Sequence, residues 1–296
     1  MKFSIIIPLY NGGGFIEKTL DSVLAQTYKD YEIVLINDES PDNVDQVVNQ
    51  YNTNHPETRF VYLEQKNKGL GGARNTAIRR SSGEIIAILD QDDIWYPDKL
   101  EKVAGIYREN KDVSIVCHNQ YVRNRGIITN VFVMGSHEEK MHRKLLLQGN
   151  CLSTSATTFR RAVIDDVGYF SEQVNKLHFV EDYELWLRMA YKGHRFYFMP
   201  EILGEYTIHG ANYSQHEIIC KGELFVLNQH YRLLKHKRLF DRLRIQKRKS
   251  DCLLVVAYNL FFHDKRYFAG ALYLLRAIAN YPFVLARCLK IWSKYL

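Results

Sequence analysis

The sequence predicts an α/β protein in which a mixed, mainly parallel sheet is flanked by helices and followed by a C-terminal helical extension. Two observations lead to this prediction. In the first ninety residues, short apolar runs alternate with amphipathic segments, which is typical of βαβ units around a buried parallel sheet. From Cys220 onward, helical spacing continues almost to the end of the sequence, with an interruption at Pro282. The whole sequence lacks the ~20-residue apolar run needed to cross a bilayer.

The elements follow in a regular order along the sequence. Strands are predicted from β-rich apolar runs, and helices from apolar residues three or four positions apart, as in Ile16, Leu20 and Val23. The strands expected from these runs are residues 3–8, 31–36, 59–63, 84–89, 113–118, 126–133, 155–159, 196–199 and 203–208. The helices expected between them are residues 15–26, 44–51, 72–80, 97–109, 137–148 and 181–191.

Charge divides the sequence of 296 residues into two parts. The net charge of +7 combines a net of −5 over residues 1–220 with a net of +12 over residues 221–296. We therefore expect a domain over residues 1–220, with halves 1–115 and 116–220, and a basic, amphipathic helical tail over 221–296. A basic tail of this kind indicates an anionic partner, and a membrane surface and nucleic acid are the two candidates.

Cysteine usage and the N-terminus indicate a cellular compartment. The five cysteines are widely spread and contain no C-x-x-C pair, which favours free thiols in a reducing compartment over a disulfide framework or a zinc site. The apolar run after Met1 has the length of a strand and lacks the features of a signal peptide. We therefore expect a cytoplasmic protein.

Polar and glycine-rich segments follow the first four predicted strands. In parallel sheets, ligands bind beyond the carboxyl ends of the strands, so these segments are the candidate site. The glycines alone are weak evidence, because they match neither a phosphate loop nor a dinucleotide loop. Asp38 is open to two interpretations, a ribose-binding acid or the N-cap of the next helix. The four segments are Pro8 to Gly14, Asn37 to Ser40, Asn67 to Asn75 and Asp90 to Asp93.

The strongest signal is the sequence Asp90-Gln91-Asp92-Asp93. Three carboxylates at the end of a buried strand repel one another unless a positive group lies among them. A hard divalent cation with oxygen ligands, Mg²⁺ or Mn²⁺, is the natural partner when diphosphate oxygens complete its coordination. The alternative is a solvated acidic turn that caps the helix near Pro97.

These motifs together resemble family 2 glycosyltransferases, which have the GT-A fold and invert the anomeric centre. The resemblance is dense over residues 3–100 and sparse over residues 150–215. It is carried by the opening Ser4 to Asn11, by Ile36 to Ser40, by Gly69, Ala73, Arg74 and Asn75, by Leu89 to Asp93 with Trp95, Pro97 and Leu100, by Glu181 to Trp186, and by Tyr206 to His209.

The resemblance implies roles for individual residues. Asp182, in the family's Glu-Asp motif, is the expected general base that deprotonates the acceptor hydroxyl. Asp92 is the expected metal ligand, and His209 is expected to reach the metal or the diphosphate. The cofactor implied is Mn²⁺ or Mg²⁺. The residues expected to bind the nucleotide-sugar are Pro8, Tyr10, Asn11, Asp38, Gly69, Arg74, Asp90 and His209.

The function that follows is transfer of a sugar from a nucleotide-diphosphate sugar, most often a UDP-sugar, to a glycan or lipid-linked glycan acceptor. We expect the tail to hold the enzyme on the inner face of the cell membrane. An oxidoreductase on a dinucleotide-binding fold is an alternative, but the fingerprint glycines are absent. A nucleic-acid-binding protein is a second alternative, and we expect no nucleic-acid partner because residues 1–220 are acidic.

Overall fold

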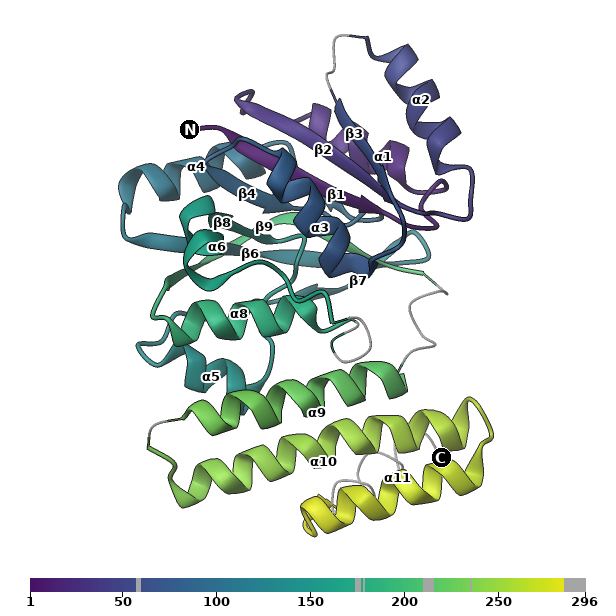
Figure 1. Ribbon diagram of the computed structural model, residues 1–296, viewed down its shortest axis with the longest axis vertical. Helices are drawn as coiled ribbons and strands as arrows, with labels where there is room; N and C mark the ends of the chain where they lie inside the picture. The colour runs from purple at the N-terminus through teal and green to yellow at the C-terminus, as the bar shows by residue number, and fades with distance from the viewer. Residues whose placement is uncertain (57–59, 174–176, 178, 210–215, 235, 285–296) are drawn as a thin grey trace. The chain divides into compact units, whose positions relative to one another are not determined.

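A computed structural model describes residues 1–56, 60–173, 177, 179–209, 216–234 and 236–284 (Figure 1). These residues form two compact units. The first is drawn from Met1–Met141, Cys151–Val174 and Glu181–Gly210, and it contains the sheet. The second is drawn from His142–Asn150, Asn175–Val180 and Ala211–Leu296.

The described strands form one sheet in the order β3-β2-β1-β4-β8-β6-β9-β5, and β7 pairs with β6. Strands β3, β2, β1 and β4 are parallel neighbours, β8 runs antiparallel between β4 and β6, and β6 is parallel to β9. The strands are β1 (Phe3–Leu9), β2 (Tyr31–Asp38), β3 (Phe60–Gln65), β4 (Ile85–Ile88), β5 (Ile94–Trp95), β6 (Val113–Asn124), β7 (Ile127–Phe132), β8 (Thr157–Arg160) and β9 (Arg195–Ile208).

Helices connect the strands of the first unit and form most of the second. The helices of the first unit are α1 (Ile16–Leu24), α2 (Val44–Asn54), α3 (Gly69–Arg80), α4 (Lys99–Glu109), α6 (Arg161–Val167) and α8 (Glu181–Tyr191). The second unit contains α5 (Met141–Gln148) from His142 onward, α9 (His216–Leu233), α10 (Leu239–Phe262) and α11 (Tyr267–Asn280).

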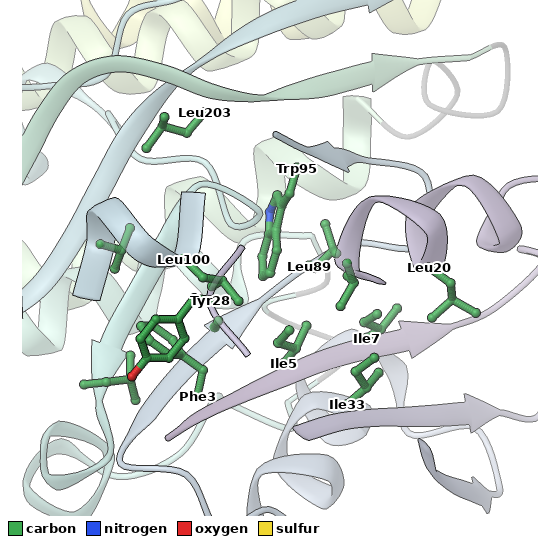
Figure 2. Close-up of a cluster of buried hydrophobic side chains, with 14 of the residues drawn as sticks. Phe3, Ile5, Ile7, Leu20, Tyr28, Ile33, Leu89, Trp95, Leu100 and Leu203 are labelled. Carbon is green, nitrogen blue, oxygen red and sulfur yellow. The ribbon is translucent and has the colours of Figure 1, made fainter. Parts of the chain in front are cut away.

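The core of the first unit lies between the central strands and the helices that cover them (Figure 2). All seven residues of β1 are buried, because a central parallel strand is covered on both faces. Ile5 and Ile7 from β1 belong to the same cluster as Leu20 from α1 and Trp95 from β5. Burial of each large aliphatic side chain stabilises the fold by about 1.5–3 kcal/mol. This cluster fixes the central strands and therefore the positions of their ends.

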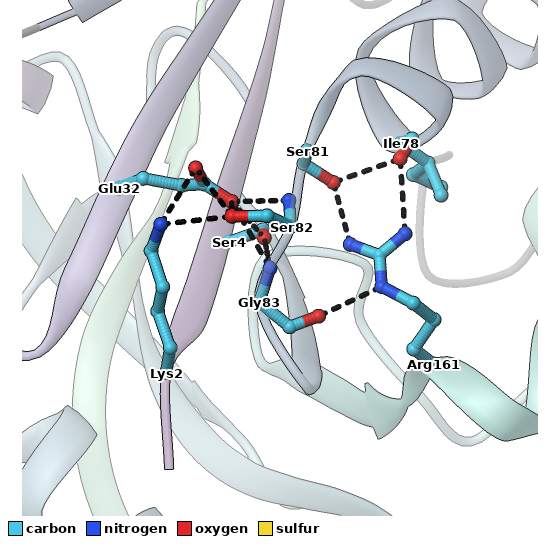
Figure 3. Close-up of polar contacts among 8 residues, drawn as sticks. All are labelled: Lys2, Ser4, Glu32, Ile78, Ser81, Ser82, Gly83 and Arg161. Carbon is cyan, nitrogen blue, oxygen red and sulfur yellow. Dashed lines mark hydrogen bonds and ion pairs between the residues drawn. The ribbon is translucent and has the colours of Figure 1, made fainter.

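A polar cluster holds the amino ends of the central strands together (Figure 3). Burial alone would raise the pKa of the Glu32 carboxyl, but hydrogen bonds from Ser4, Ser82 and Lys2 outweigh it and lower the pKa to about 2. Gly83 approaches this cluster so closely that a Cβ there would lie 2.7 Å from the backbone nitrogen of Ser4. The strand ends opposite the candidate site are thus tied together by charge-assisted hydrogen bonds.

Two strands expected near the end of the first unit are one long strand in the structure. The ranges 196–199 and 203–208 both fall within β9, which pairs with β6 along its length. Register shifts near Asn119 accommodate Pro200, whose carbonyl oxygen accepts a hydrogen bond from the Asn119 side chain at 2.8 Å. Proline interrupts a strand pattern in sequence, but a bulge absorbs it here without ending the strand.

The helices of the second unit pack on one another, and Figure 1 shows α9, α10 and α11 side by side. Their apolar cluster includes Cys220 from α9, Leu253 and Leu260 from α10, and Ala277 from α11. None of the helices among the described residues is long and apolar enough to cross a membrane.

Candidate functional site

The carboxyl ends of β1, β2 and β4 lie at one edge of the sheet, because these strands are parallel neighbours. The segment that begins at Pro8, within the last residues of β1, is bonded to both neighbouring segments. The Tyr10 backbone exchanges two hydrogen bonds with the Gln91 amide, at 3.0 and 2.7 Å, and the Asn11 nitrogen donates to the Ser40 hydroxyl at 2.7 Å. The structure therefore brings together three of the segments that the sequence singled out.

Asp38 ends β2 and is buried, with 3% of its surface exposed. One of its carboxylate oxygens accepts hydrogen bonds from the Gln65 amide at 2.6 Å and from the Lys68 nitrogen at 2.9 Å. The following helix has Asn43 at its N-cap position, so Asp38 is not the cap. Gly69 begins α3 with a φ of 73°, a backbone conformation that favours glycine. Asp38 thus connects the end of β2 to the turn that enters α3.

Arg74 lies beneath this edge as a buried counter-charge. Its guanidinium binds Asp90 at 2.8 Å and Glu181 at 2.7 Å, and 2% of the side chain is exposed. The ring of Phe170 lies 5.4 Å from the guanidinium carbon. One arginine therefore joins the end of β4 to the start of α8, although these elements are far apart in sequence.

Replacement of Arg74 by methionine should destabilise the protein by about 3–5 kcal/mol, because the buried carboxylate of Glu181 and the partly exposed carboxylate of Asp90 lose their partner. The measurement is urea-induced unfolding at neutral pH. Arg79→Met is the matched control, since Arg79 is on the same helix and forms an exposed ion pair with Glu172 at 3.6 Å. The control should cost no more than ~1 kcal/mol. Equal free energies of unfolding for the two variants would contradict a structural role for the buried pair.

The carboxylates that follow β4 have different environments. Asp92 lies 2.6 Å from the imidazole of His209, whose ring stacks on Phe15 with centroids 4.6 Å apart. Burial, and then the charge of Asp90, raise the pKa of Asp92. Asp93 is 1% exposed and accepts a hydrogen bond from the Thr207 nitrogen at 2.8 Å. Asp93 therefore fastens β9 to this segment, whereas Asp92 is paired with a side chain that can bind a metal.

The chemistry of this donor set fits a divalent cation. A carboxylate oxygen of Asp92 and an imidazole nitrogen of His209 already lie together, and the nearby charge of Asp90 favours a cation. Among the described residues, no group of three or more His, Cys, Asp or Glu side chains is arranged as a closed metal site. Any ion here would therefore need oxygen ligands from a substrate or from water to complete its coordination.

Glu181 and Asp182 begin α8 and point to different partners. Glu181 is 5% exposed and faces Arg74, and burial raises its pKa to about 7 against the opposing effect of Arg74. Asp182 is partly exposed, and its two oxygens accept hydrogen bonds from the Tyr183 nitrogen at 2.6 Å and from the Thr154 hydroxyl at 2.9 Å. Burial also raises the pKa of Asp182. Of these two acids, Asp182 is the one accessible to a substrate.

Several residues of this edge were not predicted from the sequence. Thr154 contacts Asp182, and the Ser155 hydroxyl accepts a hydrogen bond from the Asp90 nitrogen at 3.0 Å. Tyr206 lies in a motif that carries the resemblance but had no assigned role, and its ring hydroxyl also belongs to this environment, because burial and then the surrounding carboxylates raise its pKa. A lone hydroxyl residue before a short strand has no recognisable pattern, so no sequence signal could have found these contacts.

Sequence comparison gives a family for the chain. The profile described as Glycosyl transferase family 2 matches residues 4–168. An uncharacterized glycosyltransferase of Rickettsia prowazekii is 30% identical over 220 residues, which are 70% of this chain and 64% of that protein. The chondroitin synthase of Escherichia coli is 29% identical over 251 residues, which are 84% of this chain and 34% of the synthase. The chain thus spans about two thirds and about one third of the lengths of these relatives.

Structural comparison supports the same fold. TarS of S. aureus, solved in complex with UDP-GlcNAc, has a TM-score of 0.67 at 18% identity, covering 95% of this chain and 80% of that one. A mannosyltransferase from Pyrobaculum calidifontis, solved with GDP-Man and Mn²⁺, has a TM-score of 0.62 at 18% identity, covering 94% and 86% of the two chains. The predicted GT-A-type fold is therefore confirmed.

The mixed sheet and the acidic edge at its strand ends define a protein of the GT-A class. The chain belongs to glycosyl transferase family 2. The family inferred from the sequence motifs is confirmed.

Proposed function

We propose that this protein transfers a sugar from a nucleotide-diphosphate sugar to an acceptor hydroxyl in polysaccharide or lipid-linked glycan synthesis, with inversion at the anomeric carbon. One observation carries the proposal. Asp92 and His209 lie 2.6 Å apart, and the neighbouring Asp90 is joined to the start of α8, where the accessible Asp182 lies, by the ion pairs of Arg74 with Asp90 and Glu181. Such a transfer needs groups that bind a cation and a separate group that acts as a base.

The donor occupies the edge formed by the ends of β1 and β2 in this proposal. Asp38 and the backbone from Pro8 to Asn11 bind the nucleotide, and Gly69 allows the tight turn into α3 beside them. Asp90 contacts the ribose or the metal. Arg74 acts mainly by holding Asp90 and Glu181 in place, because only 2% of its side chain is exposed.

Asp92 and His209 are the residues that would hold Mn²⁺ or Mg²⁺. When bound, the ion neutralises the charge that builds on the diphosphate as it leaves. Asp92 supplies a carboxylate oxygen, which suits either ion, and His209 an imidazole nitrogen, which favours Mn²⁺ over the harder Mg²⁺. The mannosyltransferase of the same fold was solved with Mn²⁺, which supports a divalent metal here.

Asp182 is the general base. Its carboxylate takes the proton of the acceptor hydroxyl as that oxygen attacks the anomeric carbon and the bond to the diphosphate breaks. A single displacement of this kind inverts the anomeric centre and requires no nucleophile from the protein. The raised pKa of Asp182 strengthens it as a base compared with an exposed aspartate.

The donor is proposed to be a UDP-sugar. The complex of TarS with UDP-GlcNAc supports uridine, whereas the complex of the mannosyltransferase with GDP-Man is the competing precedent. The likeness to chondroitin synthase supports a glycan as the acceptor.

The test is binding of UDP-, GDP- and other nucleotide-sugars by calorimetry with Mn²⁺ present, followed by donor hydrolysis. The expected result is micromolar affinity for one class of nucleotide-sugar and no measurable binding of the other classes in the panel. Binding of NADH in preference to every nucleotide-sugar would contradict the proposal. Inversion is read from the anomeric configuration of the transferred sugar by NMR.

We also propose that the basic tail binds the cytoplasmic face of an anionic membrane. Three exposed apolar residues of α11, Phe268, Leu272 and Leu275, follow the helical spacing of one face. Arg242 and Lys247 on α10 are exposed as well. Basic groups near an anionic surface contribute ~1 kcal/mol each, and an apolar helix face adds burial.

Flotation with vesicles of anionic phospholipid tests the tail proposal. The full chain should float with anionic vesicles and less with neutral ones, and Phe268→Ser, Leu272→Ser and Leu275→Ser together should abolish flotation. The matched control replaces three exposed apolar residues of the first unit, Ile127, Ile128 and Val133, with serine. Equal flotation of the two triple variants would remove the α11 face from the interaction.

A further inference from the structure

A turn that the sequence did not single out contacts both the proposed base, Asp182, and the acidic segment that begins at Asp90. It comprises residues 153–156, immediately before β8, and its own hydrogen bond joins the Ala156 nitrogen to the Ser153 carbonyl at 3.2 Å. The Thr154 hydroxyl donates to Asp182 at 2.9 Å, and the Ser155 hydroxyl accepts from the Asp90 nitrogen at 3.0 Å. Two adjacent residues therefore connect the base on α8 with the acidic segment after β4.

The turn itself is held by buried donors. The carbonyl oxygen of Ser155 accepts hydrogen bonds from the Trp95 indole at 2.7 Å and from the Lys99 side-chain nitrogen at 2.9 Å. Trp95 is 1% exposed and Lys99 is 0% exposed, and the Lys99 Nζ lies 3.2 Å from the centre of the indole ring. Because burial of a lysine without compensation is costly, its use to hold one carbonyl indicates that the position of this turn matters.

Asp182 depends on the turn for its orientation. The donor to Oδ1 is the Tyr183 nitrogen, a backbone group at the start of its own helix. The donor to Oδ2 is the Thr154 hydroxyl, which comes from a different element. With each oxygen bonded from a different direction, the carboxylate has one preferred rotamer. Loss of the Thr154 hydroxyl would remove this restraint on the rotation of Oδ2.

We propose that Thr154 is a positioning residue of the transfer reaction, which orients Asp182 relative to the donor edge while Ser155 fixes Asp90. This inference rests on the proposed function. Catalytic groups must be held within about 0.5 Å of their productive geometry, and supporting hydrogen bonds supply that precision. Thr154 does not touch the reacting atoms in this proposal and acts through Asp182.

The charged and titratable groups that face Asp182 allow a specific expectation for the pH profile. Burial raises the pKa of the Asp182 carboxyl, Arg74 from α3 lowers it, Asp90 raises it, and Tyr206 from β9 interacts with it. Glu181 is its neighbour on α8, and the two acids influence one another. A hydroxyl that donates to a carboxylate stabilises the charged form and lowers its pKa. Removal of the Thr154 hydroxyl should therefore raise the pKa of Asp182 and shift the rising limb of the pH–rate profile to higher pH.

The test compares Thr154→Val, Thr154→Ser and the control Thr157→Val in the full chain. Thr157 is also buried, and its hydroxyl donates within the same region, to the Ser153 carbonyl at 2.7 Å. Thr154→Val should lower kcat roughly 10- to 100-fold with little change in the donor affinity measured by calorimetry. Thr154→Ser should restore both kcat and the position of the pH limb, and Thr157→Val should leave the limb in place.

The outcomes separate this inference from the proposed function. Suppose that the wild-type chain transfers sugar, and that Thr154→Val keeps the wild-type kcat and the wild-type position of the rising limb of the pH–rate profile. The positioning role is then wrong and the proposed function stands. If Thr157→Val moves the limb as far as Thr154→Val does, the effect belongs to the stability of the region and the inference is overturned. If the wild-type chain transfers no sugar with any donor, the proposed function itself fails. A thermal melt of each variant confirms that the folded protein is compared.

Discussion

Asp92→Ala should abolish sugar transfer and leave the fold intact. The variant loses the carboxylate that lies 2.6 Å from His209, so the proposed metal loses one of its two proposed protein ligands. The fold should tolerate the change, because burial and Asp90 raise the pKa of Asp92, which means that folding disfavours its charged form. Thermal stability at neutral pH should therefore not fall. Transfer rate and Mn²⁺ binding by calorimetry are the two measurements.

Asp98→Ala is a suitable control for the Asp92 variant. Asp98 lies just before α4, is about half exposed and pairs with the exposed Lys102 at 2.8 Å, so its loss should leave transfer and metal binding unchanged. The wild-type enzyme should lose activity in EDTA and regain it when Mn²⁺ is added. Full activity of Asp92→Ala in the presence of EDTA would show that the metal role is wrong.

The strand ends that form the site were predictable because local signals specify them. The apolar runs that form β1, β2 and β4 are short and continuous, and polar or glycine-rich segments follow each of them. Parallel pairing then places these segments at one edge without further information. The start of α3 was less well predicted, since the helix begins at Gly69 and includes three glycines that weaken a helical pattern.

The contacts between distant elements could not be predicted in the same way. The resemblance implies that Arg74 binds the nucleotide, but its partners Asp90 and Glu181 belong to different elements, and only the fold shows that it is buried between them. An acidic turn that caps the next helix is one interpretation of the sequence around Asp93, whereas the structure bonds Asp93 to the Thr207 nitrogen of β9. Single polar residues of this kind carry no periodicity, so their partners depend on packing that the sequence pattern does not encode.

Asp182→Asn should lower the transfer rate by ~10²–10⁴-fold, the usual contribution of a general base. The change is nearly isosteric and removes the proton acceptor, while donor binding at the ends of β1 and β2 should persist. Glu181→Gln should cost less activity. Glu181 is buried against Arg74 at 2.7 Å. Its replacement should therefore change the position of α8 and the stability of the fold, and should affect the reaction of the acceptor only through these changes.

The two variants distinguish the roles of neighbouring acids that begin the same helix. Successive residues project about 100° apart around a helix axis, and here one acid faces the buried guanidinium while the other faces the Thr154 hydroxyl and remains partly exposed. Transfer rates measured beside donor affinities and urea unfolding separate chemistry from folding. An inactive, stably folded Glu181→Gln together with an active Asp182→Asn would reverse the assignment. Activity in both variants would place the base on another residue.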